Sequence, residues 1–125
     1  MACESEHFSK EELQCSHCGE CHMDAEFLEM LEEIREAYGG PIHVTSGYRC
    51  PEYNNTISNT GTTGPHTTGK AVDVKVYGKK AYKLVNTAMY HGVTGIGIHQ
   101  HGPHEGRFIH LDIIHSNVRP WIWSY

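Results

Sequence analysis

The stretch Ser46–Asp73, SGYRCPEYNNTISNTGTTGPHTTGKAVD, decides the fold because it joins a tight turn, a long polar loop and a predicted buried strand. Arg49 directly follows the Ser-Gly-Tyr turn, and the loop after it is rich in Asn, Thr and Gly. Long ordered loops of this kind are often functional. His66 lies near the end of the loop and Asp73 lies within the strand. One short stretch therefore contains an arginine, a histidine and an aspartate.

Two predicted strands carry polar side chains on one face only. Successive residues of a strand point to opposite faces. In Ala71–Val76 this alternation places Asp73 opposite a row of valines. In Arg107–Ile114 it places His110 and Asp112 opposite a row of isoleucine and leucine. Such polar groups are paired, exposed or metal-bound, and the spacing alone leaves these alternatives open.

The other predicted elements are two amphipathic helices and two short strands. Asp24 is a suitable N-cap for the first helix, which Gly39 and Gly40 end. Its apolar stripe consists of Phe27, Leu28, Leu31, Ile34 and Tyr38. The second helix is predicted over Lys79–His91, and the two strands over Ile42–Thr45 and Gly95–His99, where the glycines allow close backbone approach. We therefore expect an α+β fold, with an antiparallel sheet that carries the polar site on one face and helices on the opposite face.

Composition limits the domain count and the class of partner. A chain of 125 residues with 38% hydrophobic and 20% charged residues is typical of one globular domain. We expect a single domain over residues 1–125, with the cysteine-rich segment 1–23 packed on it. The formal net charge of -5 argues against nucleic acid as a partner, because such binding depends on a basic face.

Neither a membrane span nor a signal peptide is expected. A bilayer-spanning helix needs about 20 consecutive apolar residues, and no such run is present. The N-terminus, MACESEHFSKEE, lacks the basic and apolar regions of a signal peptide. We therefore expect synthesis in the cytoplasm without membrane insertion.

His66, Asp73 and His110 are of the residue types that bind catalytic zinc. Such a site has three protein ligands, drawn from His, Asp, Glu and Cys, and one open position for water. A loop and two strands of one sheet are able to bring these residues together. A histidine and an aspartate at this spacing are nevertheless common in any sequence, so the residues alone indicate a candidate site.

The cysteines form a second candidate metal site. Cys15, Cys18 and Cys21 have the spacing CxxCxxC, Cys50 directly follows Arg49, and Cys3 is left over. Four thiolates would form a closed structural zinc site, whereas disulfides would form in an oxidising compartment. The lack of a signal peptide favours thiolates. Either arrangement would tie the N-terminal loop to the turn that carries Arg49.

Four motifs carry a resemblance to a known family. In order, SGYRCPEYN, HTTGKAVDV, GIGIHQ and FIHLD resemble the zinc D-Ala-D-Ala carboxypeptidase family, in particular its small phage peptidoglycan peptidases. That family shares its fold with the hedgehog signalling domain. The resemblance runs from about Phe8 to the terminal WSY, nearly the whole chain.

The resemblance implies residue roles. His66, Asp73 and His110 match the family's zinc ligands. Arg49, with Tyr48 beside it, matches the family's arginine, which implies that it binds the peptide's carboxylate or acts in catalysis by polarising the scissile carbonyl. Gly64 stands where many relatives have serine, a departure that touches no ligand. The implied activity is hydrolysis of a peptide bond next to a D-amino acid in peptidoglycan stem peptides, as a carboxypeptidase or an endolysin-type endopeptidase.

The general base is the open point of this interpretation. Several relatives have an acidic residue or histidine about three positions before the last zinc histidine, where this chain has Arg107. Asp112 is the first substitute, although it equally suits a role in accepting a hydrogen bond from a zinc histidine. Glu105 is the second. The missing acid keeps open a catalytically inactive, zinc-containing binding module of the same fold.

The resemblance also implies where the protein acts. A peptidase of this kind reaches the cell wall after holin-type release or as part of a phage particle. Its partner would be the peptidoglycan stem peptide, and we expect a monomer.

Overall fold

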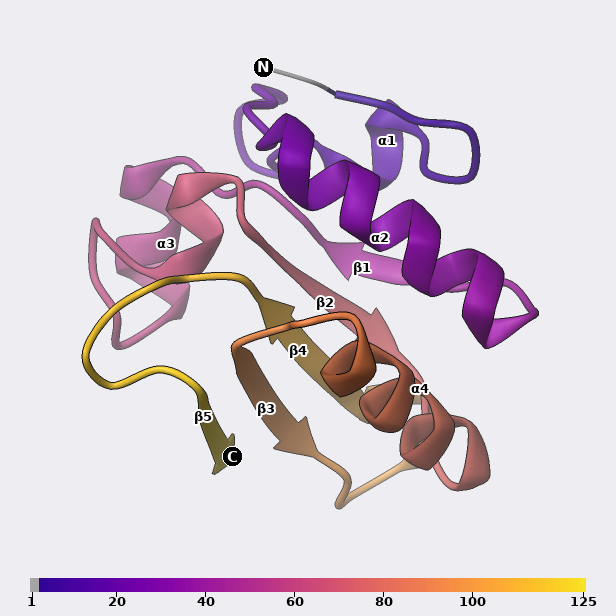
Figure 1. The fold of residues 1–125 in the computed structure, drawn as a ribbon. Helices are drawn as coiled ribbons and strands as arrows, with labels where there is room; N and C mark the ends of the chain where they lie inside the picture. Colours follow the sequence, from indigo (N-terminus) through magenta and orange to yellow (C-terminus); the bar gives the residue numbers. More distant parts are fainter. Residues whose placement is uncertain (1–2) are drawn as a thin grey trace.

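A five-stranded sheet forms the centre of the fold (Figure 1). The computed structural model describes residues 3–125. The strands are β1 (Val44–Ser46), β2 (Ala71–Lys75), β3 (Gly95–His99), β4 (Phe108–Asp112) and β5 (Trp121–Ser124), arranged in the order β1-β2-β4-β3-β5. The helices are α1 (Lys10–Leu13), α2 (Ala25–Tyr38), α3 (Pro51–Ile57) and α4 (Lys79–Tyr90), with 3-10 turns η1 (Pro65–Thr68) and η2 (His104–Gly106). The predicted α+β class is confirmed.

β5 is the one strand of residues 3–125 that the sequence did not predict. β1, β2, β4 and β3 pair in antiparallel fashion as expected, but β5 runs parallel to β3 and makes the sheet mixed. A run of four residues is too short to distinguish a strand from a packed aromatic tail. Gly97 of β3 makes the pairing possible, because a Cβ there would lie 2.7 Å from Trp123 Nε1 and 2.9 Å from Tyr125 Cε2.

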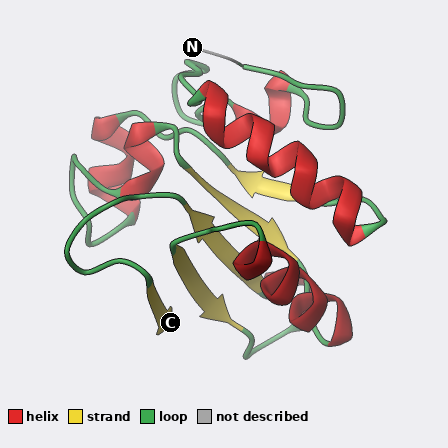
Figure 2. Cartoon of the chain, in the orientation of Figure 1, coloured by secondary structure: helices red, strands yellow, loops and turns green. Residues whose placement is uncertain are grey.

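α2 and α4 cover one face of the sheet (Figure 2). α2 begins where the Asp24 carboxylate accepts a hydrogen bond from Phe27 N at 2.9 Å, and it ends at Gly39, with φ 78°. Residues with side chains on the helix-facing side of the sheet include Val72, Val74, Ile96, Ile109 and Leu111, all buried in one core. The strand alternation thus leaves Asp73, His110 and Asp112 on the opposite face, as predicted.

The N-terminal segment is joined to the turn and loop of Ser46–Asp73. Leu13 O accepts a hydrogen bond from Tyr48 N at 2.8 Å, and Gly69 O accepts one from Asp24 N at 2.9 Å. A Cβ on Gly47 would lie 2.7 Å from Leu13 O, so only glycine permits this approach. Phe8, Leu13, Cys15 and Met23 are buried in the same core as the helices. Among the helices of residues 3–125, none combines the length and apolarity needed to cross a bilayer.

Candidate metal centre

Three predicted ligands converge on one point. Asp73 of β2 and His110 of β4 are directly paired across the antiparallel ladder, so their side chains share a face. His66 comes from η1, just before β2. One ligand atom from each of the three residues lies within 4.8 Å of the others, and all three side chains are buried. The spatial cluster that the sequence could only suggest is therefore present.

Each histidine directs one ring nitrogen towards Asp73 and has the other held by an acceptor. His66 Nε2 lies 3.2 Å and His110 Nδ1 lies 3.1 Å from Asp73 Oδ1. His66 Nδ1 donates to Gly47 O at 2.8 Å, and His110 Nε2 donates to Asp112 Oδ2 at 2.8 Å. With the outer nitrogens protonated, the inner nitrogen of each ring that faces Asp73 is the one able to offer a lone pair to Zn²⁺ once its own proton has left.

Charge interactions keep Asp73 and Asp112 ionised. Burial opposes ionisation of Asp73, but His66 and His110 outweigh it and hold the pKa of this carboxyl well below its ordinary value. Burial likewise opposes ionisation of Asp112, but hydrogen bonds from His110 and Arg119 lower the pKa of that carboxyl. The pKa of His110 is raised: burial lowers it, but the two carboxylates raise it more. Asp73 is therefore an ionised carboxylate at the centre of the cluster, which is the form that binds a metal ion.

Arg49 is fixed beside the cluster. Its guanidinium donates to Ser46 Oγ at 3.0 Å, to Asn54 Oδ1 at 3.1 Å and to Asp73 Oδ2 at 3.1 Å. Its backbone N–H donates to His66 O at 3.1 Å. Arg49 is thus held by the turn, by α3 and by a predicted metal ligand, which places a rigid cation at the edge of the site.

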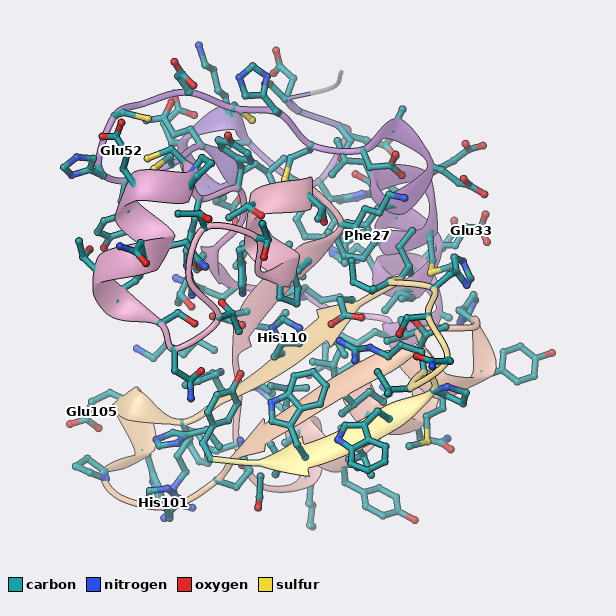
Figure 3. The ribbon with its side chains drawn as sticks, turned by 90° about the vertical axis from the view of Figure 1, so that its left-hand side faces the viewer. Phe27, Glu33, Glu52, His101, Glu105 and His110 are labelled. Carbon is teal, nitrogen blue, oxygen red and sulfur yellow. The ribbon has the colours of Figure 1, made fainter. Side chains whose placement is uncertain are left out.

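An open cleft of about 810 Å³ lies over the cluster. Its walls are the segment after α3, around Ile57–Thr60, and the C-terminal segment with Trp121, Trp123 and Tyr125. Figure 3 shows His110 at the centre of this face, between the pink α3 region and the pale yellow β5. The tryptophans of the tail therefore form part of the cleft wall.

Asp112 holds His110 and does not line the cleft. It is fully buried, and both oxygens are occupied: Oδ2 by His110 and by Arg119 Nη2 at 3.1 Å, and Oδ1 by Ile114 N at 3.1 Å and Arg119 Nε at 3.3 Å. Of its two predicted roles, this geometry is that of a residue that orients a metal-binding histidine. Arg119, which completes the arrangement, had no signal in the sequence beyond lying near the aromatic tail.

The geometry does not bring Glu105 to the site. Glu105 lies in η2, is exposed and is not among the cleft residues. Figure 3 shows Glu105 and His101 at the edge of the molecule, directed away from His110. Tyr48 is also outside the cleft: it is buried beneath the turn, with its ring 5.1 Å from that of His22.

His99 is another cleft residue that sequence reasoning missed. In residues 3–125 its Nδ1 is the one buried side-chain nitrogen or oxygen without a hydrogen-bond partner. The ring stacks on Phe108 at 4.9 Å. His99 pairs with Phe108, and Gly97 with His110, so His99 and His110 are diagonal neighbours on one face. The alternation within GIGIH indicated which residues share a face with His99. The pairing register, which makes His99 a neighbour of His110, could not be read from the sequence.

Three of the four predicted cysteine ligands lie together. Sulfur atoms of Cys15, Cys18 and Cys50 lie within 4.8 Å of one another. Cys21 is not in this group, and the thiol of Cys3 donates to its carbonyl oxygen at 2.9 Å. Burial raises the pKa of Cys15, but backbone N–H groups of Cys50, Cys18 and His17 outweigh it and bring that pKa to about 7. Burial and the Cys3 thiol raise the pKa of Cys21 to about 12.

Comparison with known proteins adds one positive finding. The family model described as Peptidase M15 matches residues 6–112, which include the three predicted ligands, Arg49 and Asp112. No curated protein matches the chain.

Proposed function

Because the chain belongs to the peptidase M15 family, we propose that it is a zinc-dependent peptidase that hydrolyses a peptide bond next to a D-amino acid in peptidoglycan stem peptides. One observation carries the proposal: the inner nitrogens of His66 and His110 and a carboxylate oxygen of Asp73 converge at the base of an open cleft. We propose that residues 1–125 act as one peptidase domain, with the zinc at this cluster.

Zinc bound there would lower the pKa of a coordinated water from 15.7 to about 7 and polarise the scissile carbonyl. His66, Asp73 and His110 would supply three protein ligands and leave one position open to the cleft. Gly47 O and Asp112 keep both imidazoles in the tautomer that ligation needs. The protein's contribution is thus a preformed, oriented donor set.

Arg49 is suited to hold the substrate. A planar guanidinium binds a carboxylate or a carbonyl oxygen through paired donors. Because Arg49 lines the cleft and is already anchored to Ser46, Asn54 and Asp73, it would meet the substrate in a fixed orientation. In a carboxypeptidase its partner is the terminal carboxylate, and in an endopeptidase it is a carbonyl of the stem peptide.

His99 is our candidate for the proton acceptor. Among the cleft residues that are not proposed ligands, His99 and Tyr125 are the side chains of types that serve as general acids or bases. Burial raises the pKa of Tyr125, which disfavours it as a base. Diagonal neighbours in a sheet lie about 7–8 Å apart, with their Cβ atoms somewhat closer, so His99 is near enough to act on a water above His110, directly or through a second water.

An inactive, zinc-containing binding module of the same fold is the second candidate. It is favoured by one observation: Asp112 is enclosed by Arg119 and His110, and Glu105 points away from the cleft. Such a module would bind a stem peptide through Arg49 without cleaving it.

Incubation of the zinc-loaded protein with purified peptidoglycan, followed by mass spectrometry of the products, tests both candidates. Released D-alanine indicates a carboxypeptidase and opened cross-links indicate an endopeptidase. His66→Ala should abolish cleavage, whereas the exposed His115→Ala should not. Binding without cleavage would establish the second candidate.

We also propose that the protein acts as a monomer on the cell wall, after holin-type release or within a phage particle.

A further inference from the structure

A second cluster, separate from the proposed catalytic ligands, consists of Cys15, Cys18 and Cys50. We propose that these three thiolates bind a structural zinc ion, and that Cys21 is not a ligand. The inference goes beyond the proposed peptidase activity and does not depend on it.

The backbone around Cys15 is shaped for a sulfur ligand. The segment Cys15–Gly19 closes on itself, with Gly19 N donating to Cys15 O at 2.8 Å. Gly19 adopts a left-handed φ of 76°, which an L side chain would resist. The backbone N–H of Cys50 donates to Cys15 Sγ at 3.4 Å, and N–H groups of His17 and Cys18 also contact this sulfur. Amide donors directed at one sulfur favour its thiolate, which is the form that binds metal.

The separation of the three sulfurs fits a tetrahedral ion. Zn–S bonds of about 2.3 Å at tetrahedral angles put neighbouring sulfurs about 3.8 Å apart. The sulfurs of the cluster lie within 4.8 Å of one another, so small side-chain rotations would bring them to that distance. Binding would release a proton from each thiol that is protonated beforehand. The fourth position of the tetrahedron remains for a water molecule.

Cys21 is separated from this cluster by its own environment. Its backbone oxygen accepts the Cys3 thiol at 2.9 Å, and it is partly buried against the main core. Its sulfur does not join the group of mutually close ligand atoms. The CxxCxxC motif therefore supplies two of the proposed ligands, Cys15 and Cys18. The left-handed turn at Gly19 separates Cys21 from them.

The position of Cys50 links the two metal sites. Cys50 directly follows Arg49, and Gly47, two residues before Arg49, supplies the carbonyl that holds His66 Nδ1 at 2.8 Å. Cys15 lies two residues after Leu13, which accepts the Tyr48 N–H. An ion at the cysteines would therefore join the N-terminal segment to the turn before Cys50. It would fix that turn, which positions Arg49 and His66.

The test is zinc stoichiometry in wild type and in Cys18→Ser, Cys21→Ser and His66→Ala, all purified under reducing conditions. Cys18 is exposed, so its replacement disturbs the core least. We expect two zinc ions per chain in wild type and in Cys21→Ser, and one in each of the other variants. After cobalt substitution, the near-ultraviolet thiolate-to-cobalt absorption should persist in His66→Ala and disappear in Cys18→Ser.

A second measurement needs no variant. Zinc should protect Cys18 of the wild type from alkylation by iodoacetamide, and a chelator should restore labelling, as read by peptide mass spectrometry. Equal labelling with and without zinc, or a disulfide among the three cysteines in the reduced preparation, would overturn the site. Loss of the second zinc in Cys21→Ser as well would overturn the three-thiolate ligand set. Because His66→Ala reports on the other cluster, failure here is distinct from failure of the proposed peptidase site.

Discussion

Asp112 Oδ2 lies 2.8 Å from His110 Nε2, and the same oxygen accepts a hydrogen bond from Arg119 at 3.1 Å. This carboxylate has no exposed surface. It determines which nitrogen of His110 carries the proton and which faces Asp73. A residue predicted as a possible base is therefore placed to orient a proposed ligand.

Asp112→Asn should weaken zinc binding at the catalytic cluster about 10–100-fold, since partners that hold a ligating histidine contribute that much. Competition with a chromophoric chelator measures the affinity, and the exposed Glu33→Gln is the control. Unchanged zinc affinity together with lost peptide cleavage would instead identify Asp112 as the base.

Gly95→Ala should also weaken zinc binding, as Asp112→Asn does, although it alters no charged group. A Cβ at this position would collide with the Asp112 carboxylate and displace it from His110. Gly106→Ala is a matched control, because a Cβ there has no neighbour within 4 Å. Equal zinc affinity of both variants and wild type, in the same chelator competition, would show that the orientation of His110 does not depend on Asp112.

The sequence was sufficient for the elements whose signal is local. The cap at Asp24, the stop at Gly39 and the apolar spacing predicted α2 as observed. Alternation placed Asp73 and His110 on the polar faces of their strands, and pairing across β2 and β4 brought them together. Neighbours in sequence thus determine the bounds of α2 and the face on which each strand residue lies, whereas the pairing of Asp73 with His110 joins residues far apart in the chain.

The remaining features depend on distant residues. Arg119 reaches Asp112 only because the chain after β4 returns over the sheet, and no local pattern indicates this. The parallel pairing of β5 depends on contacts at Gly97. Likewise, the separation of Cys21 from Cys15 depends on the left-handed turn at Gly19, which the regular cysteine spacing conceals.

Arg49→Lys should lower kcat/KM about 10–100-fold with zinc content unchanged, because lysine keeps the charge but cannot reproduce the planar set of donors. Steady-state kinetics on a stem peptide with metal analysis tests this. Arg35→Lys, on the far helix α2, is the control. Kinetics equal to wild type would exclude Arg49 from substrate binding.

Glu32→Gln should reveal a pH-dependent contribution to stability. Glu32 accepts hydrogen bonds from Ser5 Oγ at 2.5 Å and His7 N at 2.7 Å, and contacts His7 Nδ1 at 2.6 Å. Burial raises its pKa, but these partners outweigh burial and lower it from the ordinary 4.5. A lowered pKa in the folded state stabilises the protein above the unfolded-state pKa, and this is lost as pH falls through the folded-state pKa.

Urea unfolding should therefore show Glu32→Gln about 1–2 kcal/mol less stable than wild type near neutral pH. The difference should shrink below pH 4.5, the ordinary value for this carboxyl. Glu33→Gln, one position along the helix and exposed, should match wild type at every pH. A difference that is constant with pH would mean that the carboxylate charge of Glu32 does not contribute.

His99→Gln should lower kcat about 10²–10⁴-fold if this ring accepts the proton of the hydrolytic water, since general bases contribute on that scale. Glutamine preserves polarity and approximate size, so the stacking position against Phe108 stays filled, and zinc content should be unchanged. His101→Gln is the matched control, because His101 is a near neighbour of His99 but faces away from the cleft. A wild-type kcat in His99→Gln would exclude His99 as the base. Continued cleavage would then direct attention to Tyr125, the other cleft residue of a suitable type, whose ring lies 6.0 Å from that of His99.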